Sequence, residues 1–149
     1  AQYLATRAVE QDQTNPYALD ALSQSLILQN RYAEADIVAD RARKNAAGLP
    51  HSFSWDMKSC LSALSVGRID TALDLALSSH RKMPFYRPAL RYLAALSCLT
   101  DKPDDAARYA AQLRRLEPDF TLKILLNDDY PIVTLRNLGL IERLRTLLS

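Results

Sequence analysis

The chain has 149 residues, a formal net charge of +2, a hydrophobic fraction of 48% and only three glycines. A chain of this length can bury a continuous core, and this apolar content excludes an intrinsically disordered segment. Its cations are not concentrated in one segment. This argues against direct nucleic-acid binding, because phosphate contacts need a basic stripe.

Membrane and redox signals are weak. No apolar run reaches the roughly 20 residues that a membrane-spanning helix needs, and no signal peptide is visible. Cys60 and Cys98 both lie within apolar helical patterns, which favours buried free thiols over a disulfide. We therefore expect a cytoplasmic protein without membrane insertion.

Residues 1–13 open the chain with an apolar stripe at helical spacing, formed by Leu4, Ala5, Ala8 and Val9. We interpret this segment as the second helix of a truncated repeat. The chain does not begin with Met, and its pattern starts in mid-helix. We therefore expect a fragment of a larger protein.

An internal period of 34 residues runs through the helical pattern that follows. It separates Ala8 from Ala42, Ala72 from Ala106, Ala76 from Ala110 and Pro84 from Pro118. Alignment on these positions predicts helix pairs at residues 16–49, 50–86 and 87–120. Glycines and prolines fall between the predicted helices or in first turns, where helices start and stop.

Small side chains recur where the two helices of each pair are expected to cross, because alanine lets helix axes approach closely. The predicted structural repeat positions are Ala35, Ala39, Ala42, Ala72, Ala76, Ala106 and Ala110 at the crossings, with Pro84 and Pro118 after second helices. An antiparallel helical bundle with coincidental spacing is the alternative.

The period, the small residues and the prolines resemble the tetratricopeptide-repeat family over about residues 1–120. The resemblance implies an all-α fold, a right-handed αα superhelix (solenoid) of about three repeats within a single domain. It also implies that the first helices of successive repeats line a concave groove.

Residues 121–149 depart from the repeat. A short helix after Asp119, a break before Pro131, a stop at Gly139 and an amphipathic segment at 140–148 are expected. Because a solenoid needs its last apolar face covered, we predict that this tail is a C-terminal capping helical segment.

The last third of the chain also carries a narrower resemblance to a bacterial group. The similar stretches are Pro84-Phe85-Tyr86-Arg87-Pro88-Ala89-Leu90-Arg91-Tyr92-Leu93-Ala94-Ala95, Glu117-Pro118-Asp119-Phe120-Thr121, Tyr130-Pro131 and Leu138-Gly139-Leu140. In that group the repeats follow a winged-helix DNA-binding domain of a transcriptional regulator or a class III adenylate cyclase domain. The resemblance implies that the output domain lies outside these residues.

No constellation for catalysis or metal binding is visible. His51 and His80 are separated by 29 positions, and the cysteines lack metal-ligand spacing. The acidic pair Asp104-Asp105 fits the first turn of a helix, and Asp128-Asp129 fits a loop before a proline. We predict no enzymatic activity, no catalytic or metal-binding residue and no cofactor for this fragment.

Carried over position by position, the resemblance implies a partner-binding groove of mixed apolar and polar side chains. Its candidates are Tyr17, Asp20, Gln24, Ile27, Leu28, Met57, Leu61, Leu64, Arg91, Ala95 and Cys98. Such a surface suits an extended peptide or an amphipathic helix. The negative Asp20 disfavours the C-terminal carboxylate that some chaperone-binding repeats clamp.

We therefore expect a non-catalytic protein–protein interaction and regulatory module, the sensing or scaffolding C-terminal part of a bacterial transcriptional regulator. One alternative is the regulatory tail of a class III adenylate cyclase. Another is a homo-oligomerisation domain, in which a second copy covers the stripe of residues 1–13 or the 140–148 helix. A small-molecule effector near Phe53, Trp55, Tyr86 and Tyr92 is also considered.

Overall fold

The computed structural model describes residues 2–149, and within them every regular element is helical. The prediction of an all-α fold is confirmed. The elements are α1 (Gln2–Gln11), α2 (Pro16–Leu28), α3 (Tyr32–Asn45), α4 (Ser52–Ser65), α5 (Ile69–Lys82), α6 (Arg87–Leu99), α7 (Pro103–Arg114), η1 (Leu122–Leu126), α8 (Val133–Asn137) and α9 (Leu140–Leu148). None of the helices among residues 2–149 is long and apolar enough to cross a membrane.

The starts and stops of the helices follow local chemistry. The Asn15 side chain accepts hydrogen bonds from the Tyr17 and Ala18 backbone N–H groups at 3.0 and 3.2 Å, which satisfies free donors at the start of α2. Pro16 and Pro103 open α2 and α7, because a proline in the first turn costs no hydrogen bond.

One turn geometry occurs three times, after α2, α4 and α6. Asn30, Gly67 and Asp101 each adopt a left-handed backbone, with φ of 59°, 80° and 57°. In each turn the next residue donates a backbone hydrogen bond to the carbonyl five positions earlier: Arg31 to Leu26 (2.9 Å), Arg68 to Ala63 (3.0 Å) and Lys102 to Ser97 (2.8 Å). This arrangement caps the helix and reverses the chain, so α2/α3, α4/α5 and α6/α7 leave their turns in the same way.

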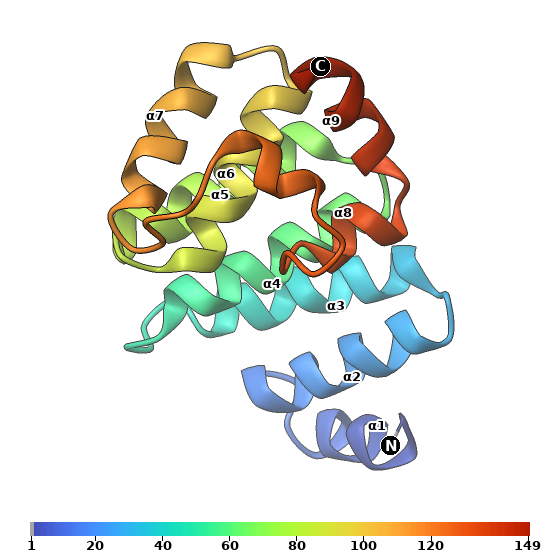
Figure 1. Cartoon of the computed structure of the whole chain (residues 1–149). Helices are drawn as coiled ribbons and strands as arrows, with labels where there is room; N and C mark the ends of the chain where they lie inside the picture. The colour runs from blue at the N-terminus through green and yellow to red at the C-terminus, as the bar shows by residue number, and fades with distance from the viewer. Residues whose placement is uncertain (1) are drawn as a thin grey trace.

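Helices adjacent in the sequence pack against each other from α1 to α7. Figure 1 shows them following one another from α1 at the bottom to α7 at the upper left. The alanines predicted at the crossings are all buried: Ala35, Ala39, Ala42, Ala72, Ala76, Ala106 and Ala110. Pro84 and Pro118 are exposed in the connections that follow α5 and α7.

The crossings are close enough for a serine on one helix to reach the backbone of the next. Ser23 of α2 donates to the Ala35 carbonyl oxygen at 2.8 Å, and Ser79 of α5 donates to that of Phe53 at 2.8 Å. Ser59 of α4 donates to the Ala39 carbonyl oxygen of α3 at 3.2 Å, and this bond links the α2/α3 pair to the α4/α5 pair. These short side chains hold helices together without the volume that would separate their axes.

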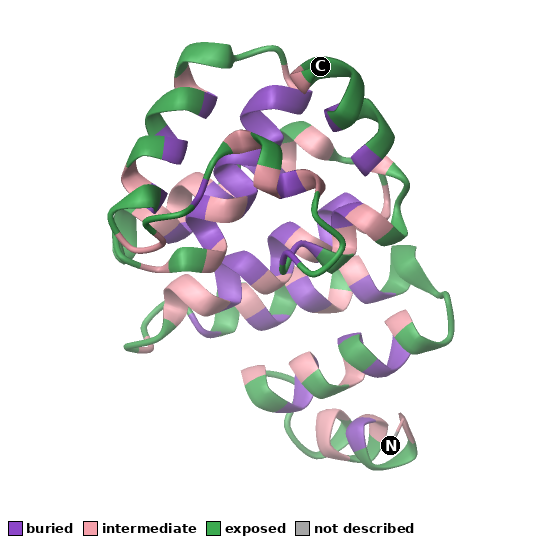
Figure 2. Ribbon diagram, in the orientation of Figure 1, coloured by how far each residue is buried: buried purple, intermediate pink, exposed green. Residues whose placement is uncertain are grey.

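The C-terminal segment folds back onto α4 and α6, which are the first helices of the second and third helix pairs. The η1 helix and α9 pack on α6, and α8 reaches α4; the segment crosses the front of the molecule in Figure 1. Its Leu125, Ile132 and Leu135 are fully buried in the main core. Figure 2 shows that burial is concentrated in α4 and α6 and is sparse in α1.

Replacing a crossing alanine by leucine tests the close approach. We expect Ala106→Leu to lower the free energy of unfolding by about 1–3 kcal/mol, because a fully buried crossing cannot take the added volume. Ala107 is the exposed neighbour on the same helix, and Ala107→Leu should stay within about 0.5 kcal/mol. Urea unfolding followed by circular dichroism measures both, and equal losses would contradict the crossing argument.

Candidate binding groove

The predicted groove residues fall into an open group and a covered group. On α2, Tyr17, Gln24 and Leu28 are exposed, whereas Asp20 and Ile27 are half-buried. On α4 and α6, Leu61 and Arg91 are half-buried, but Met57, Leu64, Ala95 and Cys98 are buried in the core. The last four side chains are therefore not accessible to a partner in this structure.

The C-terminal segment accounts for this covering. Tyr130, Ile132 and Leu135 join the same core cluster as Met57 and Ala95. They come from the stretch that includes α8, which packs on α4. The faces of α4 and α6 that a partner was expected to meet are therefore partly covered by the chain itself.

A polar triad fastens this segment to α6. Arg91 Nε donates to Glu117 Oε1 at 3.0 Å, and the Tyr130 hydroxyl donates to Glu117 Oε2 at 3.0 Å. The Arg91 guanidinium also lies 5.7 Å from the centre of the Tyr130 ring. Burial, and then the negative charge of Glu117, raises the pKa of Tyr130, which keeps its hydroxyl protonated as a donor.

One cavity remains open at the edge of the C-terminal segment, beside α8. It has a volume of about 380 Å³ and lies between α2, α3, α4 and α8; we call it the α2–α8 pocket. Its lining is Asp20, Ser23, Gln24, Ile27, Tyr32, Ala39, Lys58, Leu61, Ser65, Thr134, Asn137 and Leu138. Asp20, Gln24, Ile27 and Leu61 of the predicted groove thus meet in one place.

Sequence reasoning missed the other half of this pocket. Lys58 of α4 forms an ion pair with Asp20 of α2 at 2.7 Å. Lys58 also lies 4.4 Å from the centre of the Trp55 ring, and Tyr17 packs edge-on against Trp55 at 5.4 Å. The cation and the carboxylate offset each other, so the pocket carries no net charge of its own.

The rim of the pocket offers amide groups and its floor is apolar. Gln24 and Asn137 are exposed, and their side-chain amides make no hydrogen bond within residues 2–149. An amide can both donate and accept, which matches the peptide backbone of a ligand. Ile27, Leu61 and Leu138 add the apolar surface that could hold a single side chain.

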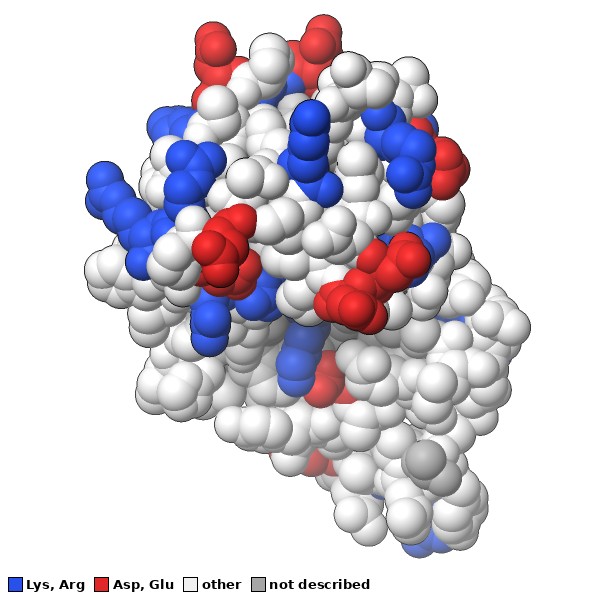
Figure 3. Space-filling view, viewed as in Figure 1, with Lys and Arg blue, Asp and Glu red and all other residues white. Residues whose placement is uncertain are grey.

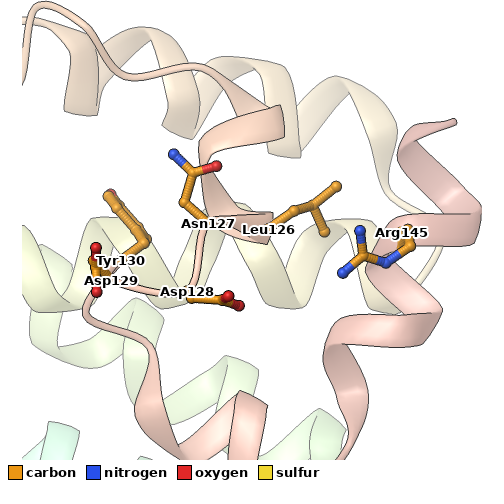
Figure 4. A pocket seen from close by; sticks show the side chains of 6 residues that line it. All are labelled: Leu126, Asn127, Asp128, Asp129, Tyr130 and Arg145. Carbon is orange, nitrogen blue, oxygen red and sulfur yellow. The ribbon is translucent and has the colours of Figure 1, made fainter.

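A second hollow, of about 630 Å³, lies beside α9 and has a polar character. Figure 4 shows Arg145 of α9 on one side of it, the 127–130 turn on the other, and Asp128 extending between them. Arg145 pairs with Glu142 of its own helix at 3.4 Å. Within residues 2–149, no group of His, Cys, Asp or Glu is arranged to hold a metal ion.

The other reactive groups are placed for packing. Cys60 and Cys98 are free and buried, and desolvation raises the pKa of both thiols, which disfavours the nucleophilic thiolate. His80 packs edge-on against Tyr109 at 5.8 Å, and desolvation lowers its pKa. His51 packs edge-on against Phe53 at 5.9 Å.

No protein-family model and no curated protein sequence matches this chain. The case for its function therefore depends on the geometry of the groove and on the repeated helix pairs.

The triad gives a direct test of how the covering segment is held. Tyr130→Phe should lower the free energy of unfolding by about 1–2 kcal/mol, because it removes a buried hydrogen bond to a charged acceptor. Tyr32→Phe is the matched control: its hydroxyl donates to Asn30 at 2.8 Å on the exposed surface. Chemical denaturation compares the two, and a loss in Tyr32→Phe as large as that in Tyr130→Phe would count against the triad.

Proposed function

We propose that this chain is a tetratricopeptide-type helical-repeat module that binds an extended segment of a protein partner through the α2–α8 pocket. Its context would be the C-terminal regulatory part of a bacterial transcriptional regulator, as the resemblance of residues 84–149 implies. The pocket is the single observation that carries the binding proposal, because it gathers four predicted groove residues around one opening.

The repeated architecture supports the solenoid interpretation. The three left-handed turns and the buried alanines at corresponding crossings are what successive copies of one helix-pair unit should have. Such units stack against their neighbours and leave a row of first helices as a concave surface. In this chain the first helices are α2, α4 and α6.

The chemistry of the pocket supports a peptide rather than a charged metabolite. The Lys58–Asp20 pair leaves no net charge for an ion to meet, whereas the free amides of Gln24 and Asn137 suit backbone groups. An extended chain could place one apolar side chain over Leu61 and Leu138 and bond both amides along its backbone. Specificity would come from that side chain, and register from the amides.

Leu138→Arg tests this site. Leu138 is 37% exposed at the pocket rim, so the substitution should fold and yet fill the opening with a charge. Peptides selected from a random displayed library against the unmodified chain should bind Leu138→Arg about tenfold more weakly. Fluorescence anisotropy with the selected peptides measures the change.

Ile37→Arg is the control, since Ile37 is 64% exposed on α3 outside this pocket. It should leave the affinity within about twofold. If the selected peptides bind all three proteins equally, or lose affinity equally for both variants, the α2–α8 pocket is not the binding site.

Self-association is a second candidate, favoured by exposed apolar side chains near the N-terminal end. Tyr3, Leu4, Tyr17 and Leu28 are large, apolar and exposed on α1 and α2. The Gln29 amide bonds Gln2 at 2.6 Å, which brings the start of α1 to the end of α2. A second copy would bury these side chains and make the molecular weight depend on concentration.

Light scattering on the unmodified chain and on Leu4→Ser/Leu28→Ser distinguishes this second function. At about 100 μM we expect the unmodified chain to be dimeric and the Leu4→Ser/Leu28→Ser variant to be monomeric. A strictly monomeric unmodified chain over that range would rule out self-association through this face.

A further inference from the structure

The connection between α5 and α6 displays an aromatic side chain that the fold does not use. Phe85 is 74% exposed, and the neighbouring Met83 is also exposed. Arg81 and Arg87 flank them and are exposed as well. We call these four residues the Phe85 patch; none of them lines the α2–α8 pocket.

The turn that carries Phe85 is fixed at both ends. The Met83 backbone N–H bonds the Ser79 carbonyl oxygen at 2.9 Å, and the Tyr86 N–H bonds that of Met83 at 3.1 Å. Pro84 sits at the second position of this turn, where its restricted φ is suited to the geometry. The Tyr86 ring packs edge-on against Phe53 of α4 at 4.8 Å, so the exposure of Phe85 is a fixed property of the turn.

The charges beside Phe85 are of one sign and lack partners. Arg81 and Arg87 form no ion pair with a carboxylate within residues 2–149, in contrast to Lys82 between them. The Lys82 ammonium pairs at 2.8 Å with Asp56, whose side chain is 1% exposed. The charge of Lys82 is therefore neutralised by Asp56. Arg81 and Arg87 remain available to a carboxylate of a binding partner.

Further cations lie along the same edge of the molecule. Helices α3, α5 and α7 run in the same direction and each has basic residues in its last turn. In α3 both cations, Arg43 and Lys44, are paired with Asp40. Figure 3 shows several Lys and Arg side chains at the upper left of the molecule, with acidic side chains beside them. A negatively charged partner would be attracted to this edge over roughly a Debye length, about 8–10 Å at physiological salt.

We propose that the Phe85 patch is a docking surface for an acidic protein segment that contains apolar side chains. Carboxylates of the segment pair with Arg81 and Arg87, and its apolar residues cover Phe85 and Met83. Aromatic residues, Met and Arg are enriched at protein interfaces, and Arg is also enriched among the few residues that contribute most of the binding energy. This surface lies outside the α2–α8 pocket and does not depend on the proposed function of that pocket.

The composition of the patch favours a protein over a lipid bilayer or a nucleic acid. Recruitment by anionic lipid headgroups requires clusters of about 4–8 Lys or Arg, and the turn has two unpaired cations. Nucleic acids bind rows of cations that follow the phosphate spacing, whereas the centre of this patch is apolar. An acidic segment with one or two apolar side chains matches both the two arginines and the apolar centre of the patch.

The test uses a defined probe, a fluorescein-labelled peptide in which Glu and Asp alternate with Leu and Phe. Anisotropy should show binding to the full chain at low salt, and the affinity should fall at least about fivefold between about 0.05 and 0.3 M NaCl. A peptide with Ser in place of every Leu and Phe should bind at least about threefold more weakly, because it cannot cover Phe85.

Two patch variants and two controls locate the contact. Arg81→Glu/Arg87→Glu and Phe85→Ser should each weaken peptide binding about tenfold. The controls repeat the same changes elsewhere: Arg31→Glu/Lys102→Glu, on the opposite ends of the helix pairs, and Ile37→Ser, whose side chain is 64% exposed. Both controls should stay within about twofold. Helical circular dichroism and the urea midpoint establish that all four variants fold.

Three results would overturn the proposal. The first is that the unmodified chain does not bind the acidic peptide. The second is that the controls lose as much affinity as the patch variants, which would make net charge the cause. The third is that Phe85→Ser abolishes binding to phosphatidylglycerol-containing vesicles or to a DNA duplex while leaving the peptide unaffected. Leu138→Arg should leave peptide binding unchanged, which separates this surface from the α2–α8 pocket.

Discussion

The close approach of neighbouring helices at alanine crossings is the constraint on which the rest of the structure depends. At Ala76 and Ala110 the side chain is a single methyl group and is fully enclosed or nearly so. Interaxial distances in helical proteins follow the side chains at the contact, so larger residues here would widen each helix pair. The serine-to-carbonyl bonds between helices would then break, because a bond such as that of Ser79 to the Phe53 carbonyl spans only 2.8 Å.

The same constraint sets where a ligand can bind. Tightly paired helices place α2, α4 and α6 in a row, and the C-terminal segment packs onto two of these three. The triad of Arg91, Glu117 and Tyr130 links α6, the connection after α7 and the covering segment. What stays open is the end of the row beyond α8, where α2 meets α4. The groove expected from the sequence is thereby reduced to the α2–α8 pocket, and a partner that bound there would meet α2 and α8 together.

The helical part of the fold could be predicted because its signals are local. Glycines, prolines and alternating small and large side chains mark each helix pair within a few residues, and the predicted boundaries of 16–49, 50–86 and 87–120 enclose the observed pairs. The turn residues Asn30 and Asp101 gave no comparable signal, because both occur in many loop contexts. Their left-handed backbone is recognisable only beside Gly67, which holds the corresponding place.

The covering segment and the pocket could be predicted only in part, because both depend on long-range contacts. Ile132 and Leu135 lie in short elements with too few residues to show a period. Their contact with the α4–α6 region cannot be inferred from spacing, so Met57, Leu64 and Ala95 were expected to face a groove that the tail in fact covers. The ion pair between Lys58 and Asp20 joins residues 38 positions apart, and no local pattern in the sequence indicates that these two residues pair.

Two surfaces of opposite character result from this arrangement. The α2–α8 pocket is concave and has its charges paired internally, so binding there would depend on shape and on backbone hydrogen bonds, with little dependence on salt. The Phe85 patch is exposed and has unpaired cations, so it would capture a partner quickly and release it as salt rises. A single partner with an acidic stretch and a separate apolar anchor could engage both, and its affinity would then exceed that of either contact through effective concentration. Because α4 contributes Lys58 to the pocket and Phe53 to the support of the Phe85 turn, one rigid helix would fix the spacing that such a partner must match.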